Sequence, residues 1–133
     1  MNIISHGVDI VNIPRIKSLL QKTEDHWETR CFTPLERQIA TDSGPNRVQC
    51  LAGRFAAKEA VMKALGTGWS KGISFKDIEI QKLPTGCPTV VLIGKCQEIA
   101  DALGISSWLL SISHEETYAI ASVISIGQMP DSQ

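Results

Sequence analysis

Two carboxylates in the chain could serve as ligands for a divalent cation. Asp9 lies in an apolar N-terminal stretch, and Glu59 lies in an alanine-rich segment with Lys63 four residues further on. Mg²⁺ prefers oxygen ligands and needs only one or two protein carboxylates when a substrate supplies phosphate oxygens. An ion pair between Glu59 and Lys63, one helical turn apart, explains the same residues equally well. The residues alone leave both interpretations open.

Cations and glycines gather beside Glu59. The cations are Arg54, Lys58, Lys63 and Lys71, and the glycine-containing loop is Gly66-Thr67-Gly68. Phosphate-binding glycine loops precede a helix, whereas this loop follows one, so we predict that Gly66 ends the helix in a left-handed conformation. Phosphates bound there would face the negative end of the helix dipole, and lysines and a metal ion would have to offset that charge.

Two further ionisable residues have both a structural and a chemical interpretation. His114 closes a strand-like segment before the acidic turn Glu115-Glu116. A histidine in such a place is usually a surface residue, although it could donate to a phosphate oxygen. Glu36 stands three residues after Thr33, in a capping box that explains it as a structural residue. As a carboxylate, Glu36 could also accept a proton.

Apolar spacing and capping residues predict the elements that position these side chains. The predicted elements are a strand over 2–12, helices beginning near 14, 33 and 46, a hairpin of 74–82 and 89–93, a helix over 95–103 and a second hairpin of 107–113 and 117–126. Asp9 then lies on the first strand and Glu59 on the third and longest helix, which ends at Gly66. The order βαααββαββ predicts an α+β fold with a mainly antiparallel sheet packed against the long helix.

Length and composition restrict the class of protein. The chain has 133 residues, 43% of them hydrophobic and 20% charged, with a net charge of −1. This composition excludes disorder and is typical of one globular domain. We expect a single domain over residues 1–127 and a flexible C-terminal tail over 128–133. A broad basic face for nucleic acid is not expected at this net charge.

The cysteines and the apolar segments indicate the cellular compartment in which the protein is expected. The four cysteines show no Cys-x-x-Cys spacing, so a zinc site is not expected. No basic region precedes the first apolar stretch, unlike in a signal peptide, and the uncharged run 117–130 is shorter than a membrane span. We therefore expect a cytoplasmic protein with reduced thiols and no membrane contact.

Taken together, these residues resemble the holo-acyl-carrier-protein synthase family, the small bacterial type of phosphopantetheinyl transferase. The resemblance is carried by Gly7-Val8-Asp9-Ile10-Val11, Phe32-Thr33-Pro34-Leu35-Glu36, Arg54-Phe55-Ala56-Ala57-Lys58-Glu59-Ala60, Lys63-Ala64-Leu65-Gly66-Thr67-Gly68 and Ser111-Ile112-Ser113-His114-Glu115. These blocks span nearly the whole chain in the family's order. The block from Arg54 to Gly68 is the most specific.

The resemblance implies a reaction and a set of partners. The 4′-phosphopantetheine arm of coenzyme A would pass to a serine of apo-acyl carrier protein, with release of 3′,5′-ADP, in fatty acid biosynthesis. It also implies a homotrimer with active sites between neighbouring subunits. The main alternative is a non-catalytic module of the same fold that binds coenzyme A or a nucleotide.

The resemblance further implies a role for each site residue. Magnesium is the implied cofactor, with Asp9 and Glu59 as its ligands, while Lys63 would neutralise charge on the pyrophosphate. The residues implied to hold coenzyme A are Arg54, Lys58, Gly66, Thr67, Gly68 and His114. For the serine proton, the hypothesis is a water at the metal site with Glu59 or Glu36 as the accepting carboxylate.

Overall fold

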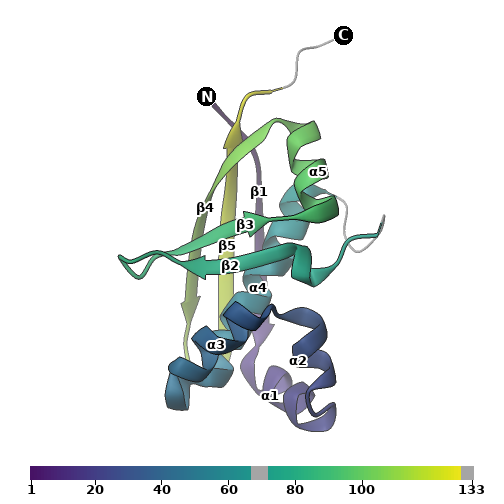
Figure 1. Cartoon of the computed structure of the whole chain (residues 1–133). Helices are drawn as coiled ribbons and strands as arrows, with labels where there is room; N and C mark the ends of the chain where they lie inside the picture. Colours follow the sequence, from purple (N-terminus) through teal and green to yellow (C-terminus); the bar gives the residue numbers. More distant parts are fainter. Residues whose placement is uncertain (67–71, 130–133) are drawn as a thin grey trace.

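The computed structural model describes residues 1–66 and 72–129 (Figure 1). Along the chain, the elements are β1 (Asn2–Asn12), α1 (Ile13–Lys22), α2 (His26–Cys31), α3 (Pro34–Asp42), α4 (Arg47–Leu65), β2 (Ile78–Lys82), β3 (Pro88–Leu92), α5 (Gly94–Leu103), β4 (Ile105–His114) and β5 (Tyr118–Gly127), with short 3-10 helices at Gly44–Asn46 and Phe75–Asp77. The α+β class is confirmed. The predicted order missed the six-residue helix α2 and both 3-10 helices, and the strand predicted over 74–82 begins only at Ile78 because a capped 3-10 turn occupies Phe75–Asp77. None of the helices in the described ranges is long and apolar enough to cross a membrane.

The strands form two antiparallel sheets. The larger sheet has the order β1-β5-β4, and β2 pairs with β3 in a separate hairpin. Helices α1, α2 and α3 gather at one end of the larger sheet and α5 lies at the other, with the hairpin between them (Figure 1). Along β5, Ala119, Ala121 and Val123 are buried, whereas Tyr118 and Ile120 are exposed. One face of the larger sheet therefore packs on α4, and the opposite face is left uncovered by the described residues.

Helix α4 packs unusually close to β1. A Cβ placed on Gly7 would lie only 2.1 Å from the carbonyl oxygen of Ala60, so no larger residue fits at this position without moving the backbone. The small side chains of Ala56, Ala60 and Ala64 are buried in the same core. Larger apolar residues of α4 are buried too. In the structure the alanine face is core as well, because it permits this close approach.

A fully buried ion pair joins α4 to α3. Lys58 Nζ lies 2.6 Å from Glu36 Oε1, and neither side chain is exposed. The same Nζ donates to the carbonyl oxygens of Cys31 at 2.7 Å and Phe75 at 3.0 Å. Buried charges are tolerated only when they are paired and their hydrogen-bonding groups are satisfied. The lysine meets this condition through three oxygens from three different segments.

Glu36 is satisfied from the backbone side as well. Its Oε1 accepts from the amide of Thr33 at 2.8 Å, in the predicted capping box, and its Oε2 accepts from the amide of Ile80 at 2.7 Å. Burial raises the pKa of Glu36 and lowers that of Lys58, while the attraction between the two charges opposes both shifts. One carboxylate thus links the start of α3, the strand β2 and the middle of α4.

This network makes a prediction about stability. Replacing Lys58 with Met leaves Glu36 as a buried carboxylate without its cation, so the free energy of unfolding should fall by about 3–5 kcal/mol. The same substitution at Lys63, whose side chain is 56% exposed, is the matched control on the same helix. Its cost should stay below about 1 kcal/mol. Denaturant unfolding measures both, and equal losses at the two positions would contradict the structural role of Lys58.

Candidate active site

The structure brings Asp9 and Glu59 together at the contact between β1 and α4. Asp9 shares a face of β1 with Gly7 and Val11, the face that packs on the helix, and its side chain is only 16% exposed. Glu59 is partly buried on α4. Both residues line one cavity of about 430 Å³, with Arg15 of α1 on the same wall. The close approach at Gly7, two residues before Asp9, is what allows the two carboxylates to face the same cavity.

The electrostatics of this pair favour a cation. Burial is the main cause that raises the pKa of Glu59, the negative charge of Asp9 raises it further, and Lys63 opposes both. Among the described residues, no group of three or more His, Cys, Asp or Glu side chains could hold a metal ion. A site with two carboxylates suits Mg²⁺, which keeps water or substrate oxygens in its other positions. The donor set therefore fits the implied metal.

Lys63 bonds across to β1. Its Nζ donates to Asp9 Oδ1 at 3.0 Å and to the carbonyl oxygen of Val8 at 3.0 Å. Lys63 therefore pairs with Asp9 of β1 and not with Glu59 along the helix. With more than half of its side chain exposed, Lys63 is free to turn toward an anionic ligand. Glu59 forms no ion pair with any described residue, so a bound cation would offset its charge.

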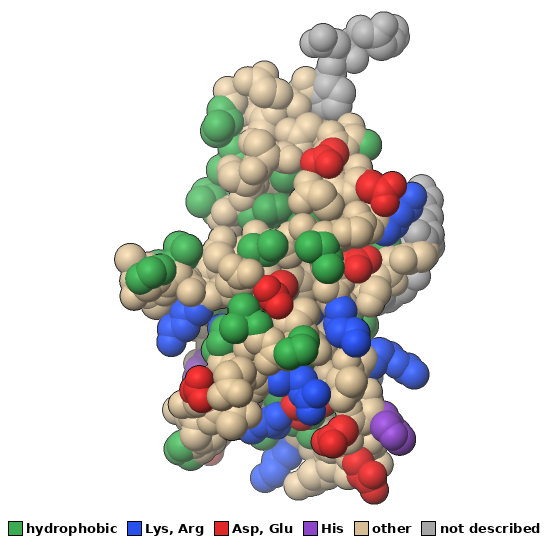
Figure 2. Space-filling view, viewed as in Figure 1, with side chains coloured by type: hydrophobic (Ala, Val, Ile, Leu, Met, Phe, Trp, Pro, Cys, Tyr) green, Lys and Arg blue, Asp and Glu red, His purple; other side chains and the backbone are tan. Residues whose placement is uncertain are grey.

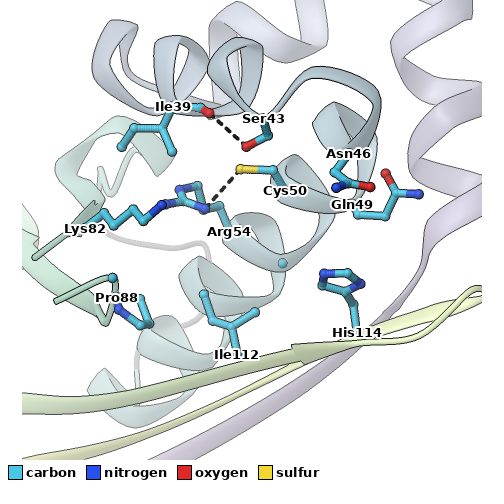
Figure 3. Close-up of a pocket in the computed structure, with 12 residues that line it drawn as sticks. Ile39, Ser43, Asn46, Gln49, Cys50, Arg54, Lys82, Pro88, Ile112 and His114 are labelled. Atoms are coloured by element: carbon cyan, nitrogen blue, oxygen red, sulfur yellow. Dashed lines mark hydrogen bonds between the residues drawn. The ribbon is translucent and has the colours of Figure 1, made fainter. Parts of the chain in front are cut away.

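A second cavity lies on another side of α4 (Figure 3). It has a volume of about 440 Å³, and α3, α4, the β2–β3 hairpin and the end of β4 enclose it. Two residues expected to hold coenzyme A, Arg54 and His114, line this cavity together with Lys82. The residues that line it include no aspartate or glutamate within the described ranges. The cavity is therefore electropositive.

Arg54 is only partly satisfied in this cavity. Its residue surface is 8% exposed, and its Nη1 donates to the sulfur of Cys50 at 3.1 Å. Its Nε finds no hydrogen-bond partner among the described residues, and neither does Oε1 of the neighbouring Gln49. A buried guanidinium with an unused donor is costly unless a ligand accepts from it. This geometry suits an anionic group beside a hydrogen-bond donor of a base or sugar.

Arg54 and Glu59 line different cavities beside α4. Arg54 and Glu59 are five residues apart on α4, and at about 100° per residue their side chains point about 140° apart around the helix. Each residue lines a different cavity. The sequence motif that holds both residues therefore places them on different sides of α4.

Two residues of the expected site lie elsewhere. Lys58, expected to hold coenzyme A, and Glu36, a candidate proton acceptor, form the buried pair described above. The geometry does not support either role, because the charged atoms are enclosed by protein and already bonded. Gly66 ends α4 with a φ of 77° and donates to the carbonyl oxygens of Met62 and Lys63, as expected for a helix stop. Thr67, Gly68, Lys71 and the tail residues 130–133 lie outside the described residues.

Sequence reasoning also missed part of the second cavity. Gln49 and Lys82 line it, although neither belongs to a block that carried the resemblance. Gln49 lies five residues before Arg54 on α4, outside the three- and four-residue spacings that share a helix face, so helical spacing from Arg54 would not have indicated it. Nothing in the sequence places Lys82 there, because the hairpin meets α4 only through the tertiary fold.

Comparisons with known proteins bear on this geometry. The profile of the 4′-phosphopantetheinyl transferase superfamily matches residues 5–123. The chain belongs to the 4′-phosphopantetheinyl transferase superfamily. The holo-[acyl-carrier-protein] synthase of Koribacter versatilis is 45% identical over 122 residues, which are 92% of this chain and 97% of the relative. That of Gloeobacter violaceus is 43% identical over 121 residues, 91% of each chain.

Solved structures of the transferase superfamily have the same fold. The crystal structure of the Neisseria meningitidis holo-[acyl-carrier-protein] synthase matches with a TM-score of 0.82 and 36% identity, over 94% of this chain and 99% of that one. The Helicobacter pylori enzyme in complex with coenzyme A matches with a TM-score of 0.80 and 36% identity, over 91% and 99%. The family resemblance and the α+β fold class inferred from the sequence are therefore confirmed.

The raised pKa of Glu59 makes a prediction about this transferase without metal. The folded protein holds the Glu59 proton more tightly than the unfolded chain does, so stability is lost as the pH rises above the ordinary value of 4.5. Glu59→Gln carries no charge and escapes this loss. Solvent screens the charge at this partly exposed site, so the effect should be small. In EDTA, the Tm of Glu59→Gln should be roughly 1–3 °C higher than that of the wild type at neutral pH and equal to it near pH 4.

A matched control is available on α5. Glu98 is exposed, so Glu98→Gln should leave Tm unchanged at both pH values. Thermal unfolding by circular dichroism measures all three proteins. A Glu59→Gln variant that melts below the wild type at neutral pH would show that Glu59 is a stabilising partner rather than a repelled carboxylate.

Proposed function

We propose that this chain is a holo-acyl-carrier-protein synthase. It transfers 4′-phosphopantetheine from coenzyme A to a serine of apo-acyl carrier protein and releases 3′,5′-ADP, a reaction of fatty acid biosynthesis. The observation that carries the proposal is the cluster of Asp9, Glu59 and Lys63 at the contact between β1 and α4, in a chain of this superfamily. We place the reaction in the cytoplasm, where the four free cysteines stay reduced.

Asp9 and Glu59 would hold Mg²⁺ at this cluster. When bound, the metal supplies positive charge to pyrophosphate oxygens, and phosphoryl transfer depends mainly on such charge neutralisation and on positioning. Lys63 adds a second cation on the exposed side, and its bond to Asp9 keeps its amine within reach of the same oxygens. Glu36 is enclosed in the core, which leaves Glu59 as the carboxylate that accepts the serine proton, directly or through a water.

The electropositive cavity of Figure 3 would hold the 3′,5′-ADP half of coenzyme A. The unused Nε of Arg54 can donate to a phosphate oxygen, and Lys82 and His114 approach the cavity from β2 and the end of β4. The unpartnered oxygen of Gln49 can accept from the adenine amine or a ribose hydroxyl. Under this proposal, the nucleotide half lies on one side of α4 and the reacting pyrophosphate on the other.

The separation of the two clusters supports an oligomer with shared sites. In this arrangement, one coenzyme A would extend from the cavity of one subunit to Asp9 and Glu59 of a neighbour. The uncovered face of the larger sheet offers a contact surface, because it exposes Val8 at 49%, Ile10 at 60%, Leu109 at 57% and Tyr118 at 47%. Exposed apolar patches of this kind mark association surfaces. We propose a homotrimer, in which every subunit gives one half of a site to each of two neighbours.

The carrier protein would dock over α1. Arg15 lines the same cavity as Asp9 and Glu59, and Lys17 and Lys22 are exposed on the same helix. Charged side chains crowd over the helical end of the molecule in the space-filling view (Figure 2). Cations there can meet an acidic partner and direct its serine toward the carboxylates.

The first experiment measures the intact mass of apo-acyl carrier protein. Incubation with this protein, coenzyme A and Mg²⁺ should add one phosphopantetheine, and EDTA should abolish the gain. Asp9→Asn and Glu59→Gln should each lower kcat/KM by at least about a hundredfold, because each removes charge needed only at the reacting phosphate. Coenzyme A binding without any mass gain would favour the non-catalytic binding module instead.

Mixing two inactive variants tests the shared site. Asp9→Asn damages one half of each site and Arg54→Gln damages the other, so a trimer assembled from both contains some sites with neither change. Random mixing after unfolding and refolding should restore about a quarter of wild-type activity. Light scattering should show a trimer for each variant alone. No recovery in a mixed trimer would place both halves of the site in one subunit.

A further inference from the structure

The four cysteines stand in different surroundings. Cys31 and Cys96 are buried at 1% and 0% exposure, and burial raises the pKa of each thiol to about 11. Both therefore stay protonated and enclosed at neutral pH. Cys87 is exposed in the turn between β2 and β3. Cys50 is partly exposed and lines the cavity of Figure 3. Only Cys50 and Cys87 can therefore meet a reagent from solvent.

The surroundings of Cys50 differ from those of Cys87 in charge and in structure. Arg54 donates to the sulfur of Cys50 at 3.1 Å, and Lys82 and His114 line the same cavity. Reactive cysteines occupy electropositive, partly exposed places of this kind. Arg54 has a second feature, which points to an anionic ligand. Its residue surface is 92% buried, and its Nε has no hydrogen-bond partner among the described residues. The thiol and the unused donor thus face one cavity.

We propose that Cys50 is a thiol-modification site that reacts with anionic low-molecular-weight disulfides, and that the adduct closes the cavity to the nucleotide. The second clause rests on the proposed function, and the first does not. The Cys50 sulfur, after giving up its proton, attacks one sulfur of the disulfide and forms a new S–S bond. The original S–S bond breaks, and its second sulfur leaves as a thiolate that takes up the proton. Cys50 is oxidised and the reagent disulfide is reduced.

The position of Cys50 explains why an adduct would exclude the nucleotide. The sulfur lies on the cavity wall beside the guanidinium that would bind phosphate, so a bound thiol with carboxylates occupies the same space. Its carboxylates would accept from Arg54 in place of the phosphate. Cys87 is exposed and does not itself line the cavity, although Gly86 and Pro88 do, so its thiol serves as the comparison for reaction outside the cavity wall. Modification at Cys50 is therefore a switch that a reductant reverses.

The test compares Cys50 with Cys87 in the whole protein. Glutathione disulfide serves as the probe, and peptide mass mapping follows the adduct at both cysteines over time. Cys50 should react faster than Cys87, and dithiothreitol should remove the adduct. In parallel, the anionic reagent iodoacetate and the neutral reagent iodoacetamide are compared. The ratio of iodoacetate to iodoacetamide rates should be several-fold higher at Cys50, and Arg54→Gln should reduce that ratio to the value at Cys87.

Ligand protection separates this proposal from the proposed function. With 3′,5′-ADP, which has no thiol, at about ten times its Kd, the reaction at Cys50 should slow about tenfold while Cys87 is unaffected. Calorimetry on the same preparation measures that Kd. If 3′,5′-ADP does not bind at all, the proposed placement of the nucleotide is wrong. The ratios of iodoacetate to iodoacetamide rates at Cys50 and Cys87 then still test whether Cys50 is the modification site. Faster reaction at Cys87, or equal ratios at the two cysteines, would overturn the proposal.

Discussion

The buried ion pair between Lys58 and Glu36 sets the rotation of α4, and both halves of the candidate site depend on that rotation. Lys58 points into the core, where Glu36 and two carbonyl oxygens hold its amine. At about 100° per residue, Glu59 then points about 100° away, toward β1, while Arg54 points within about 40° of Lys58, toward the side of α3 and the hairpin. A helix with an apolar residue at position 58 could rotate slightly with little loss of packing. A charge that must meet three oxygens cannot follow such a rotation, so the pair fixes the directions of the site residues.

The second constraint is distance, and small residues set it. Gly7 and Ala60 let β1 approach α4 until a single methyl group would collide with the helix backbone. Asp9 lies two residues after Gly7 on the same face of the strand, so this approach carries its carboxylate toward Glu59. Burial raises the pKa of Glu59, and the negative charge of Asp9 raises it further. The core therefore holds two like charges together at a cost in stability, which is typical of sites that bind a cation.

Local sequence signals predicted the elements well, and tertiary contacts account for what they missed. The capping box at Thr33 and the left-handed stop at Gly66 depend on neighbouring residues alone, so both could be predicted. Helix α2 has only six residues and no side-chain cap, and the packing of Trp27 on Phe32 and Phe55 holds it in place. In the same way, nothing near position 58 indicates that its lysine is buried, because Glu36, its partner, is 22 residues away in the sequence. The Asp9 and Glu59 pair was predictable only through a resemblance that joins distant motifs.

The charges of the two clusters explain why one ligand would need both. Lys63 pairs with Asp9, whereas Glu59 forms no ion pair with any described residue, so its carboxylate is left without a cation. The cavity around Arg54, Lys82 and His114 has cations without an acidic partner, so it lacks negative charge. A nucleotide alone would satisfy the second cluster, and a divalent cation alone would satisfy the first. A ligand whose pyrophosphate carries both a nucleotide and a bound Mg²⁺ would offset the charges of both clusters. Under the proposed function, coenzyme A binds in this form. Arg54 and Glu59 line different cavities, so under the proposed homotrimer such a ligand would bridge two copies of the chain.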